Sequence, residues 1–400
     1  MSKYYRSGQV DLDELSITTK DSAPVRLDLS RSYVDVVLYE SLFDKTMSGS
    51  VSFVDSNNIV NLYSLGNGET VKVSFKTAGA DEGIEFEGAV YDITGPANIS
   101  GHASGYTLHF ISPVALESLK TPLFNGYNGR VSDFVKSAFA VTKPKKSLDV
   151  LPTKYLDSYV LTGQTPMEAI SMFGRSSVGQ DGTYGYLFYE DNLQFNFKSV
   201  QSLYKQEPVR EFFYRDVPSF NNVKNSHEEM FDVYQDFGYE DSYKYIEKIK
   251  DGVLGCTTTH VGLSDKGLQT VQHPHMSWNK VMLGKHPNTN RETDNIQAKL
   301  RVTYNVLAKQ AEPDLEKNTL ALMKCTENTF NVGIFGDSTL RVGQTVIAHI
   351  PTYSSADFTP DHIDFLSGKF LIGDIKHVIT PKKYSQRLLL IKDSYEETVL

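Results

Sequence analysis

The feature that most constrains the fold of this chain is a pattern of three strands that occurs twice, about 275 residues apart. Each copy has three segments in which apolar and polar residues alternate, as in half-buried β-strands. The segments are 68–75, 86–93 and 106–112 in the first copy, and 343–350, 368–377 and 384–391 in the second. Three strands in the same order predict an internal duplication, with Val71 equivalent to Val346 and Ile93 to Ile375.

A duplication of this kind constrains how copies of the chain can assemble. Three copies of a chain with two related β-modules present six similar modules around one axis. Such a ring can meet a threefold partner on one side and a sixfold partner on the other. The repeat therefore predicts an adaptor between assemblies of different symmetry.

Composition narrows the class of protein. A chain of 400 residues, with 40% hydrophobic and 12% aromatic residues, is long enough for two or three domains with substantial cores. Its net charge of −9 argues against a protein that grips nucleic acid by its phosphates. The basic run 143–146 is an exception, for which we predict a solvated loop.

Targeting signals are missing from the sequence. No apolar run approaches the length of a membrane helix, and the N-terminus has no apolar core of a signal peptide. The only cysteines, Cys256 and Cys325, do not make a disulfide framework. We therefore expect the chain to fold in a reducing cytoplasm.

The expected fold class is mainly β with an α+β middle part, and the two repeats are expected to form tube-like antiparallel β-barrels. We predict a first barrel over residues 1–115, an inserted α+β domain over 116–310 and a second barrel over 311–400. The segment 206–240 also has strand character and is a candidate to join the second barrel.

Local signals predict several elements. Helical periodicity indicates helices over 132–139 and 294–310, and a short helical segment follows the capping side chains at 55–58. Thr165, Pro166 and Glu168 form the strongest helix start in the chain, a capping box with proline at the first helical position. We also expect a hairpin over 184–197 with its turn at 190–192, and a strand over 319–325.

No catalytic constellation is present in the sequence. It lacks a nucleophile elbow, a zinc-binding His-Glu-x-x-His helix, a phosphate-binding glycine-rich loop and a Cys-x-x-Cys pair. His273 and His275 are weak metal candidates, because imidazoles two apart on a strand face the same way. Pro274 interrupts them and no further ligand stands at suitable spacing, so a packing role is favoured. We predict no catalytic, cofactor-binding or metal-binding residue and no enzyme activity.

Two other groups of residues have ordinary explanations. Acidic residues are so frequent that Asp232, Asp236 and Glu240 do not identify a glycosidase pair. The aromatic residues at 184–189 could bind a glycan, but their alternation favours core packing.

The segments 41–59, 106–113, 327–332, 340–343 and 368–377 together are similar to segments of a known family. Through them the chain resembles the baseplate hub protein of contractile-tailed bacteriophages, and also the hub part of type VI secretion spike proteins. The resemblance is diffuse and spans nearly the whole chain, with the middle part matching only in size and position.

This resemblance implies a homotrimer whose paired barrels form a pseudo-sixfold ring between a hexameric tail tube and a trimeric cell-puncturing spike. The implied partners are the spike protein, the tail tube or tube-initiator protein, and the surrounding baseplate wedge proteins. DNA would pass through the central channel without specific binding. The implied location is the tail baseplate of the virion, assembled in the host cytoplasm. Because the chain ends at Leu400, soon after the second repeat, we expect the spike to be a separate protein.

A function of another class stays open at this point. The middle part could be the active domain of a tail-associated cell-wall hydrolase, or it could bind glycans. Release of peptidoglycan fragments by the purified protein would favour this alternative, whereas an inactive ring-shaped trimer would favour the hub.

Overall fold

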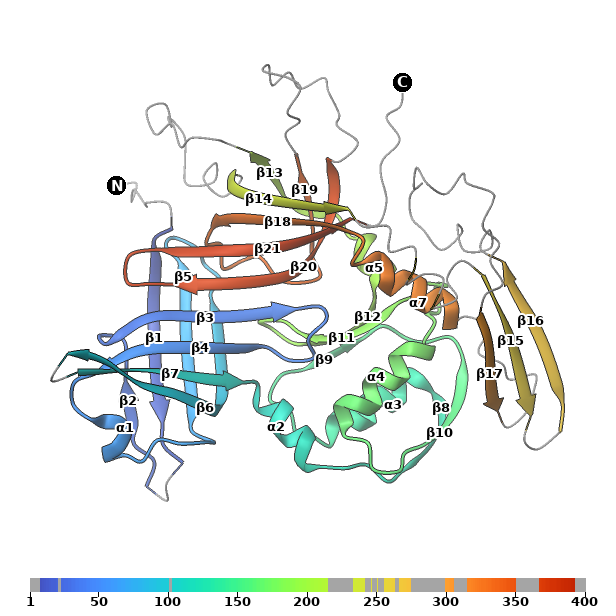
Figure 1. Cartoon of the computed structure of the whole chain (residues 1–400), viewed down its shortest axis with the longest axis horizontal. Coiled ribbons are helices and arrows are strands. Elements are labelled where there is room, and N and C mark those ends of the chain that lie inside the picture. Colours follow the sequence, from blue (N-terminus) through green and yellow to red (C-terminus); the bar gives the residue numbers. More distant parts are fainter. Residues whose placement is uncertain are drawn as a thin grey trace, which may run out of the picture.

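Most of the described chain is β-structure. The computed structural model describes residues 8–20, 23–100, 103–214, 233–241, 255–262, 266–274, 299–305, 315–349 and 367–392, with Ile246 and Lys250. Its largest element is a 13-stranded sheet that contains strands from both ends of the chain (Figure 1). The sheet has the order β19-β13-β14-β18-β21-β20-β3-β4-β7-β6-β5-β1-β2.

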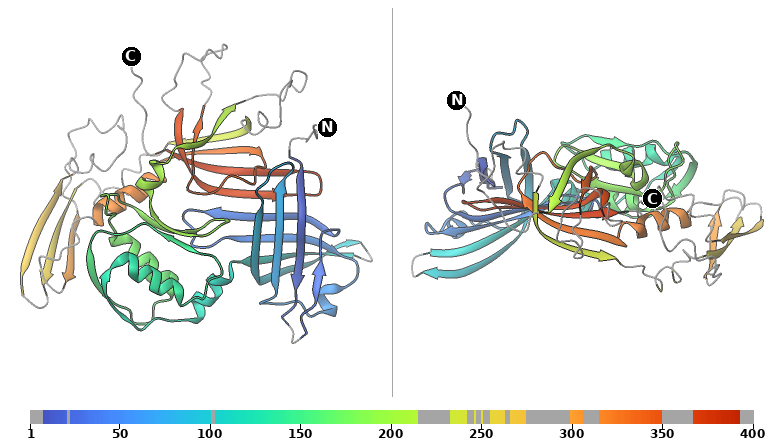
Figure 2. Two further views of the ribbon diagram at one scale, coloured as in Figure 1. Left: turned by 180° about the vertical axis from the view of Figure 1, so that it is seen from behind. Right: turned by 90° about the horizontal axis from the view of Figure 1, so that it is seen from above.

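The N-terminal half of this sheet, which we call the first module, wraps around its own apolar core. Its strands are β1 (Val10–Thr18), β2 (Arg26–Asp28), β3 (Tyr33–Ser41), β4 (Ser48–Asp55), β5 (Thr70–Thr77), β6 (Ile84–Ser100) and β7 (Ala103–Ile111). β1 and β5 run across the direction of β3 and β4 (Figures 1 and 2). Strict alternation in β4 and β5 places every second side chain in the core, including Val51, Phe53 and Phe75.

The short helix α1 (Ile59–Leu62) joins β4 to β5, as the capping side chains predict. Its start is held by Asp55, whose carboxylate accepts hydrogen bonds from the backbone N–H groups of Ile59 and Val60 at 3.0 and 3.1 Å. Asn58 itself makes no side-chain cap.

The C-terminal half, the second module, contains two strands from the middle of the sequence. Its strands are β13 (Pro208–Tyr214), β14 (Val233–Asp241), β18 (Asn328–Phe335), β19 (Thr345–Ala348), β20 (Gly368–Ile379) and β21 (Tyr384–Lys392). β19 pairs with both β13 and β20, so the strand pairings of this module return to their starting point. Its core includes Phe212, Phe330 and Phe370.

The two modules are joined strand to strand. β20 pairs antiparallel with β3 over six residue pairs, from Asp374 opposite Ser41 to Ile379 opposite Val36. The large sheet therefore continues from one module into the other without interruption (Figure 1).

A smaller α+β part follows the first module. It contains α2 (Pro113–Lys120), β8 (Gly126–Arg130), α3 (Val131–Ala140), β9 (Leu148–Val150), β10 (Leu156–Val160), α4 (Pro166–Ser176), β11 (Tyr186–Glu190), β12 (Phe195–Ser199) and α5 (Val200–Tyr204). The predicted helix over 132–139, the capping box of Thr165 and Glu168, and the hairpin with its turn after Glu190 are all confirmed. Its core is aromatic, with Phe134, Phe173 and Phe197 among its buried residues.

The helix predicted over 294–310 is wrong. Residues Lys299–Asn305 form the strand β17, which pairs parallel with β15 (Gly255–Gly262); β16 (Leu268–Pro274) completes a three-stranded sheet. Leu300, Val302 and Tyr304 alternate with polar residues, so the segment also fits a strand, and strand pairing decided between the two. This sheet lies at the end of the molecule remote from the first module (Figures 1 and 2).

The strand predicted over 319–325 is also wrong. Residues Leu315–Lys324 form the helix α7, and Ala321 is buried. A short apolar run does not distinguish a strand from a buried helix, whereas Leu, Ala and Met are strong helix formers.

The mainly β architecture with helices in the middle part is confirmed. Among the described residues, no helix combines the length and apolar character needed to cross a membrane.

Candidate functional site

One face of the large sheet presents polar side chains over eight neighbouring strands, and we call this face the wall. The strands are β14, β18, β21, β20, β3, β4, β7 and β6. The opposite face of the same strands carries the buried cores of both modules. Directly opposed residues on neighbouring strands share a face, so the register identifies the side chains of the wall.

Hydroxyl groups dominate the part of the wall in the first module. Ser48, Ser50 and Ser52 are half-buried and alternate with core residues along β4. The Ser52 hydroxyl lies 3.2 Å from the hydroxyl of Thr107 on β7. Short hydroxyl side chains of this kind make the surface polar without placing charge on it.

Basic residues on the wall have nearby partners. Arg387 on β21 donates to Asp236 on β14 at 3.2 Å. The Lys376 ammonium lies 5.4 Å from the centre of the Tyr39 ring, which is within cation–π distance. Both bases therefore interact with other groups of the wall.

A groove of about 640 Å³ crosses the wall where the two modules meet. Side chains of β14, β18, β21, β20 and β3 line it, among them Tyr39, Ser41, Asp236, Asn331 and Asp374. Burial raises the pKa of Asp374, while the hydrogen bond from the Ser41 hydroxyl at 2.6 Å lowers it and the nearby Asp44 raises it further.

A buried polar cluster lies beneath the same strand junction, on the core side. His377 on β20 and Glu40 on β3 are both fully buried, with His377 Nε2 at 3.4 Å from Glu40 Oε1. His377 Nδ1 lies 2.9 Å from the Tyr384 hydroxyl and 3.1 Å from Gln386 Nε2. This cluster ties the two modules together through side chains as well as through the β3–β20 pairing.

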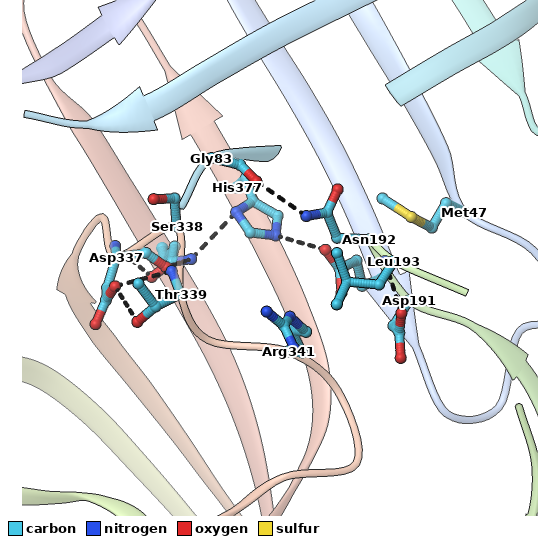
Figure 3. Close-up of polar contacts among 12 residues, drawn as sticks. Met47, Gly83, Asp191, Asn192, Leu193, Asp337, Ser338, Thr339, Arg341 and His377 are labelled. Atoms are coloured by element: carbon cyan, nitrogen blue, oxygen red, sulfur yellow. Dashed lines mark hydrogen bonds and ion pairs between the residues drawn. The ribbon is translucent and has the colours of Figure 1, made fainter. Parts of the chain in front are cut away.

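The turn after β11 connects the α+β part to the first module. Glu190 is buried and lies 2.9 Å from the Lys146 ammonium; it also accepts a hydrogen bond from the backbone N–H of Met47 at 3.1 Å. Burial raises the pKa of Glu190, and the Lys146 charge acts in the opposite direction. The Asn192 amide donates to the backbone oxygen of Gly83 at 3.1 Å (Figure 3).

The prediction of a solvated basic loop over 143–146 is therefore wrong for Lys146. Its side chain is only 22% exposed and forms the ion pair with Glu190 described above. Lys145, by contrast, is largely exposed and pairs with Glu87 on β6. Single-sequence reasoning could not find the partner of Lys146, because Glu190 is distant in the chain.

The loop before β19 forms a second connection between the modules. The Ser338 backbone N–H donates to the Thr77 hydroxyl at 2.9 Å, and Arg341 pairs with Glu82 at 2.8 Å. Ser338 and Arg341 lie near His377 in Figure 3. These contacts fix the position of the second module relative to the first.

The structure does not bring the weak metal candidates together. His273 lies on β16, opposite Cys256 on β15, and His275 lies outside the described residues. No group of three or more histidine, cysteine or acidic residues suited to a metal occurs in the described part of the chain. Cys325 is a buried cysteine whose Sγ donates to the Ala321 carbonyl at 3.5 Å.

The acidic and aromatic residues considered in the sequence analysis lie in an ion pair, on a strand or in a core. Asp236 pairs with Arg387, Glu240 lies on β14, and Asp232 is outside the described residues. Tyr186 and Phe188 are buried in the core of the α+β part, and Tyr189 is buried in the core of the second module. Burial raises the pKa of both tyrosines well above the usual range.

The fold is that of known phage tail proteins. The tail protein from Neisseria meningitidis MC58 superposes with a TM-score of 0.57 at 11% identity, covering 95% of this chain and 96% of that chain. The 43 kDa tail protein of prophage MuSo2 from Shewanella oneidensis superposes with a TM-score of 0.56 at 12% identity, covering 96% and 99%. The resemblance found in the sequence is thus confirmed at the level of the fold.

Other comparisons add less. A type VI secretion component from E. coli reaches a TM-score of 0.48 at 8% identity, covering 98% of this chain and 80% of that chain. No protein-family model matches the sequence. A search of curated proteins also gives no match.

Proposed function

We propose that this chain is the structural hub of a phage tail baseplate. In this proposal three copies form a pseudo-sixfold ring that joins the hexameric tail tube to a trimeric spike, with baseplate wedge proteins around it. The ring forms part of the DNA conduit, and the chain carries no catalytic residue. The proposed place of action is the tail of the virion.

The observation that carries the proposal is that the two modules repeat the same strand register. In the first module Val71 lies opposite Gly88, and Ile93 opposite Leu108. In the second module Val346 lies opposite Phe370, and Ile375 opposite Leu388. If Val71 is equivalent to Val346 and Ile93 is equivalent to Ile375, the paired strands have the same register in both modules. An internal duplication would require this.

Backbone irregularities recur at the same places. The Gly68 N–H donates to the Val90 carbonyl at 2.8 Å, and the Gly343 N–H donates to the Ile372 carbonyl at 2.9 Å. Both glycines have positive φ, 102° and 84°, which an L-residue rarely adopts. One residue after each carbonyl the ladder has a bulge, at Tyr91 in the first module and Gly373 in the second. Bulges that coincide in this way support a common origin of the modules.

The two modules also share the same order of strands. The sequence β3-β4-β7-β6-β5-β1 in the first matches β14-β18-β21-β20-β19-β13 in the second. The modules differ at the last position, where β1 is antiparallel to β5 and β13 is parallel to β19. The circuit of pairings in the second module supports a tube-like barrel there. We accordingly propose modules at 1–115 and 311–400, with the segment 206–240 contributing to the second and the α+β domain of 116–310 between them.

The chemistry of the wall supports a conduit. A polyanion slides past a surface that offers hydroxyl groups and paired bases, whereas unpaired lysine and arginine side chains would bind its phosphates. On the wall Arg387 is paired with Asp236, and Lys376 lies over Tyr39. We propose that the wall lines the channel and that the channel is neutral or acidic.

The similar structures support a role in phage tails, since the proteins from Neisseria meningitidis and from prophage MuSo2, with TM-scores of 0.57 and 0.56, are tail proteins. Their identities of 11% and 12% mean that the proposal depends on this chain's own geometry for everything finer than the fold.

The decisive experiment is the mass and the projection image of the purified chain, alone and mixed with its spike protein. We expect a trimer with a central channel. A monomer by light scattering under both conditions would overturn the hub. Peptidoglycan release that is lost on substitution of His273 and His275, in a protein that still forms the trimer, would replace it with the hydrolase alternative.

A further inference from the structure

A carboxylate and an imidazole face each other in the core beneath the β3–β20 junction. The side chains of Glu40 and His377 are fully buried, and Glu40 Oε1 lies 3.4 Å from His377 Nε2. Hydrogen bonds between such atoms are usually about 2.7–3.2 Å long. Among the described residues, neither carboxylate oxygen of Glu40 nor Nε2 of His377 has a hydrogen-bond partner. Buried polar atoms are normally hydrogen-bonded, so three unsatisfied atoms at one place require a physical explanation.

The hydrogen bonds on the other side of the imidazole determine which nitrogen carries its proton. Gln386 Oε1 accepts from the Asp337 backbone N–H at 2.9 Å, and Gln386 Nε2 donates to the Asp337 carbonyl at 2.9 Å, which fixes the orientation of the amide. The second hydrogen of Gln386 Nε2 is donated to the Tyr384 hydroxyl at 3.0 Å. Tyr384 can then donate its own proton to His377 Nδ1 at 2.9 Å. A neutral His377 therefore carries its proton on Nε2, the atom that faces Glu40.

The charged side chains of the surrounding elements have partners of their own. They form three ion pairs: Asp337 with Arg210, Arg341 with Glu82 and Lys146 with Glu190, at 2.9, 2.8 and 2.9 Å. β5 contributes an aromatic ring, and burial raises the pKa of Tyr384 well above the usual range, so its hydroxyl is neutral. In the described part of the chain, the ion-pair contact of Glu40 is with His377 alone.

An ionised Glu40 beside a neutral His377 would thus be a buried charge without compensation. Such a charge is so costly that the group changes its protonation state instead. One added proton removes the net charge in either of two ways. Glu40 becomes a carboxylic acid, or His377 becomes an imidazolium that pairs with the carboxylate, while the Tyr384 hydroxyl turns to accept from Nδ1. The two groups titrate as a pair, so the number of protons bound is the same in both arrangements.

We propose that Glu40 and His377 form a buried site that binds one proton in the folded chain and thereby stabilises the junction of the two modules. Loss of this proton leaves an uncompensated charge directly beneath β3 and β20, the strands whose pairing joins the modules. The junction is therefore expected to weaken as pH rises. The site lies within one chain and does not depend on the proposed ring.

The test compares the unmodified protein with Glu40→Gln. The variant has no carboxylate, so its folded cluster is neutral without the added proton. In unfolded chains above a pH of about 5, a glutamate is ionised and holds no proton. The folded unmodified protein thus binds one proton more than the folded variant, whereas the two unfolded chains bind equal numbers.

Linkage converts this difference into a pH dependence. The contribution of the site to stability is fully present at low pH and is lost as pH rises through the point at which the folded site releases its proton. Below that point, the ratio of the folding equilibrium constants, unmodified protein over Glu40→Gln, is expected to fall about tenfold for each unit rise in pH above about 5.5. Urea denaturation at a series of pH values measures both constants.

Glu87→Gln is the matched control. It also removes one carboxylate, but Glu87 is partly exposed and pairs with Lys145 at the surface. A surface glutamate is ionised in the folded and in the unfolded chain above a pH of about 5.5. The corresponding ratio for this variant should not change with pH.

Amide hydrogen exchange locates the effect in the molecule. Between pH 6.5 and 8.5, the amides paired across β3 and β20 should lose protection relative to the amides paired across β4 and β7 in the same sample. This comparison cancels the general acceleration of exchange with pH. In Glu40→Gln the relative protection of the two strand pairs should stay constant.

Each outcome decides one part of the proposal. A ratio for Glu40→Gln that does not change with pH, like that of Glu87→Gln, overturns the proton site. A tenfold slope with unchanged relative exchange retains the bound proton but overturns its action on the junction. If Glu40→Gln fails to fold, Glu40→Met should give the same slope. If neither variant folds, the unmodified protein decides: an unfolding free energy that falls from pH 7 to 8.5 supports the site, and one that does not fall overturns it.

Discussion

The Tyr384 hydroxyl provides a test of how the two modules are held together. Tyr384 lies on β21 of the second module but packs in the core of the first, fully buried, with its ring 5.3 Å from that of Phe75. Its hydroxyl lies 2.9 Å from His377 Nδ1 and accepts from Gln386 Nε2 at 3.0 Å. Burial raises the pKa of Tyr384 well above the usual range, so the hydroxyl keeps its proton.

Tyr384→Phe keeps the ring and removes only the hydroxyl. Gln386 Nε2 keeps the Asp337 carbonyl at 2.9 Å and still lies 3.1 Å from His377 Nδ1, so the variant removes hydrogen bonds of the cluster without leaving either group unpartnered. The loss of a buried hydrogen bond costs about 0.5–1.5 kcal/mol of unfolding free energy. We expect a destabilisation in this range, measured from the midpoint and slope of urea denaturation followed by far-UV circular dichroism.

The matched control is Tyr39→Phe, which removes a hydroxyl from the solvent side of the same junction. Tyr39 is 39% exposed, and surface substitutions of this kind usually change stability by no more than about 0.5 kcal/mol. If Tyr384→Phe changes the unfolding free energy no more than Tyr39→Phe does, the buried cluster does not hold the modules together and our reasoning is refuted.

Three further predictions concern stability. A Cβ at Gly336 would lie 2.0 Å from the Tyr384 ring, so Gly336→Ala should destabilise the protein by about 1–3 kcal/mol through overpacking, measured by urea denaturation. Glu190→Ala leaves the Lys146 ammonium without its anion; we expect a loss of about 3–5 kcal/mol, and a loss below about 1 kcal/mol would contradict a tightly held ion pair. Burial raises the pKa of Asp374 above its ordinary 3.8, so the folded state binds its proton more tightly than the unfolded state does. This contribution to stability is present below the unfolded pKa and is lost as pH rises through the folded pKa. Asp374→Asn should therefore have the higher melting temperature at pH 7, and the difference should shrink as pH falls toward 4; a constant difference across that range would contradict the assignment.

Local signals in the sequence predicted much of the secondary structure. Alternation identified the strands of both repeats, since a half-buried strand needs an apolar residue at every second position. The capping box at Thr165 and Glu168 located the start of α4, because its hydrogen bonds form within one turn. The equivalences of Val71 with Val346 and of Ile93 with Ile375, and the internal duplication that they imply, stay a prediction.

Where local signals were ambiguous, tertiary packing decided. The segment 299–305 has spacings that fit either a helix or a strand, and pairing with β15 made it a strand. The segment 315–324 is helical although its apolar run also suits a strand. In the first case strand pairing outweighs a small difference in intrinsic propensity, whereas in the second the helix agrees with the propensity of Leu, Ala and Met.

The candidate site depends on contacts that no local pattern encodes. Ser41 and Asp374, whose side chains are joined by a hydrogen bond across the module junction, are 333 residues apart in the chain. Glu40 and His377 meet beneath the same junction, and neither has neighbours in sequence that indicate its partner. The alternation of residues determined which side chains face the core. Which strands became neighbours, and so which polar groups had to satisfy one another away from water, followed only from the tertiary pairing of β3 with β20.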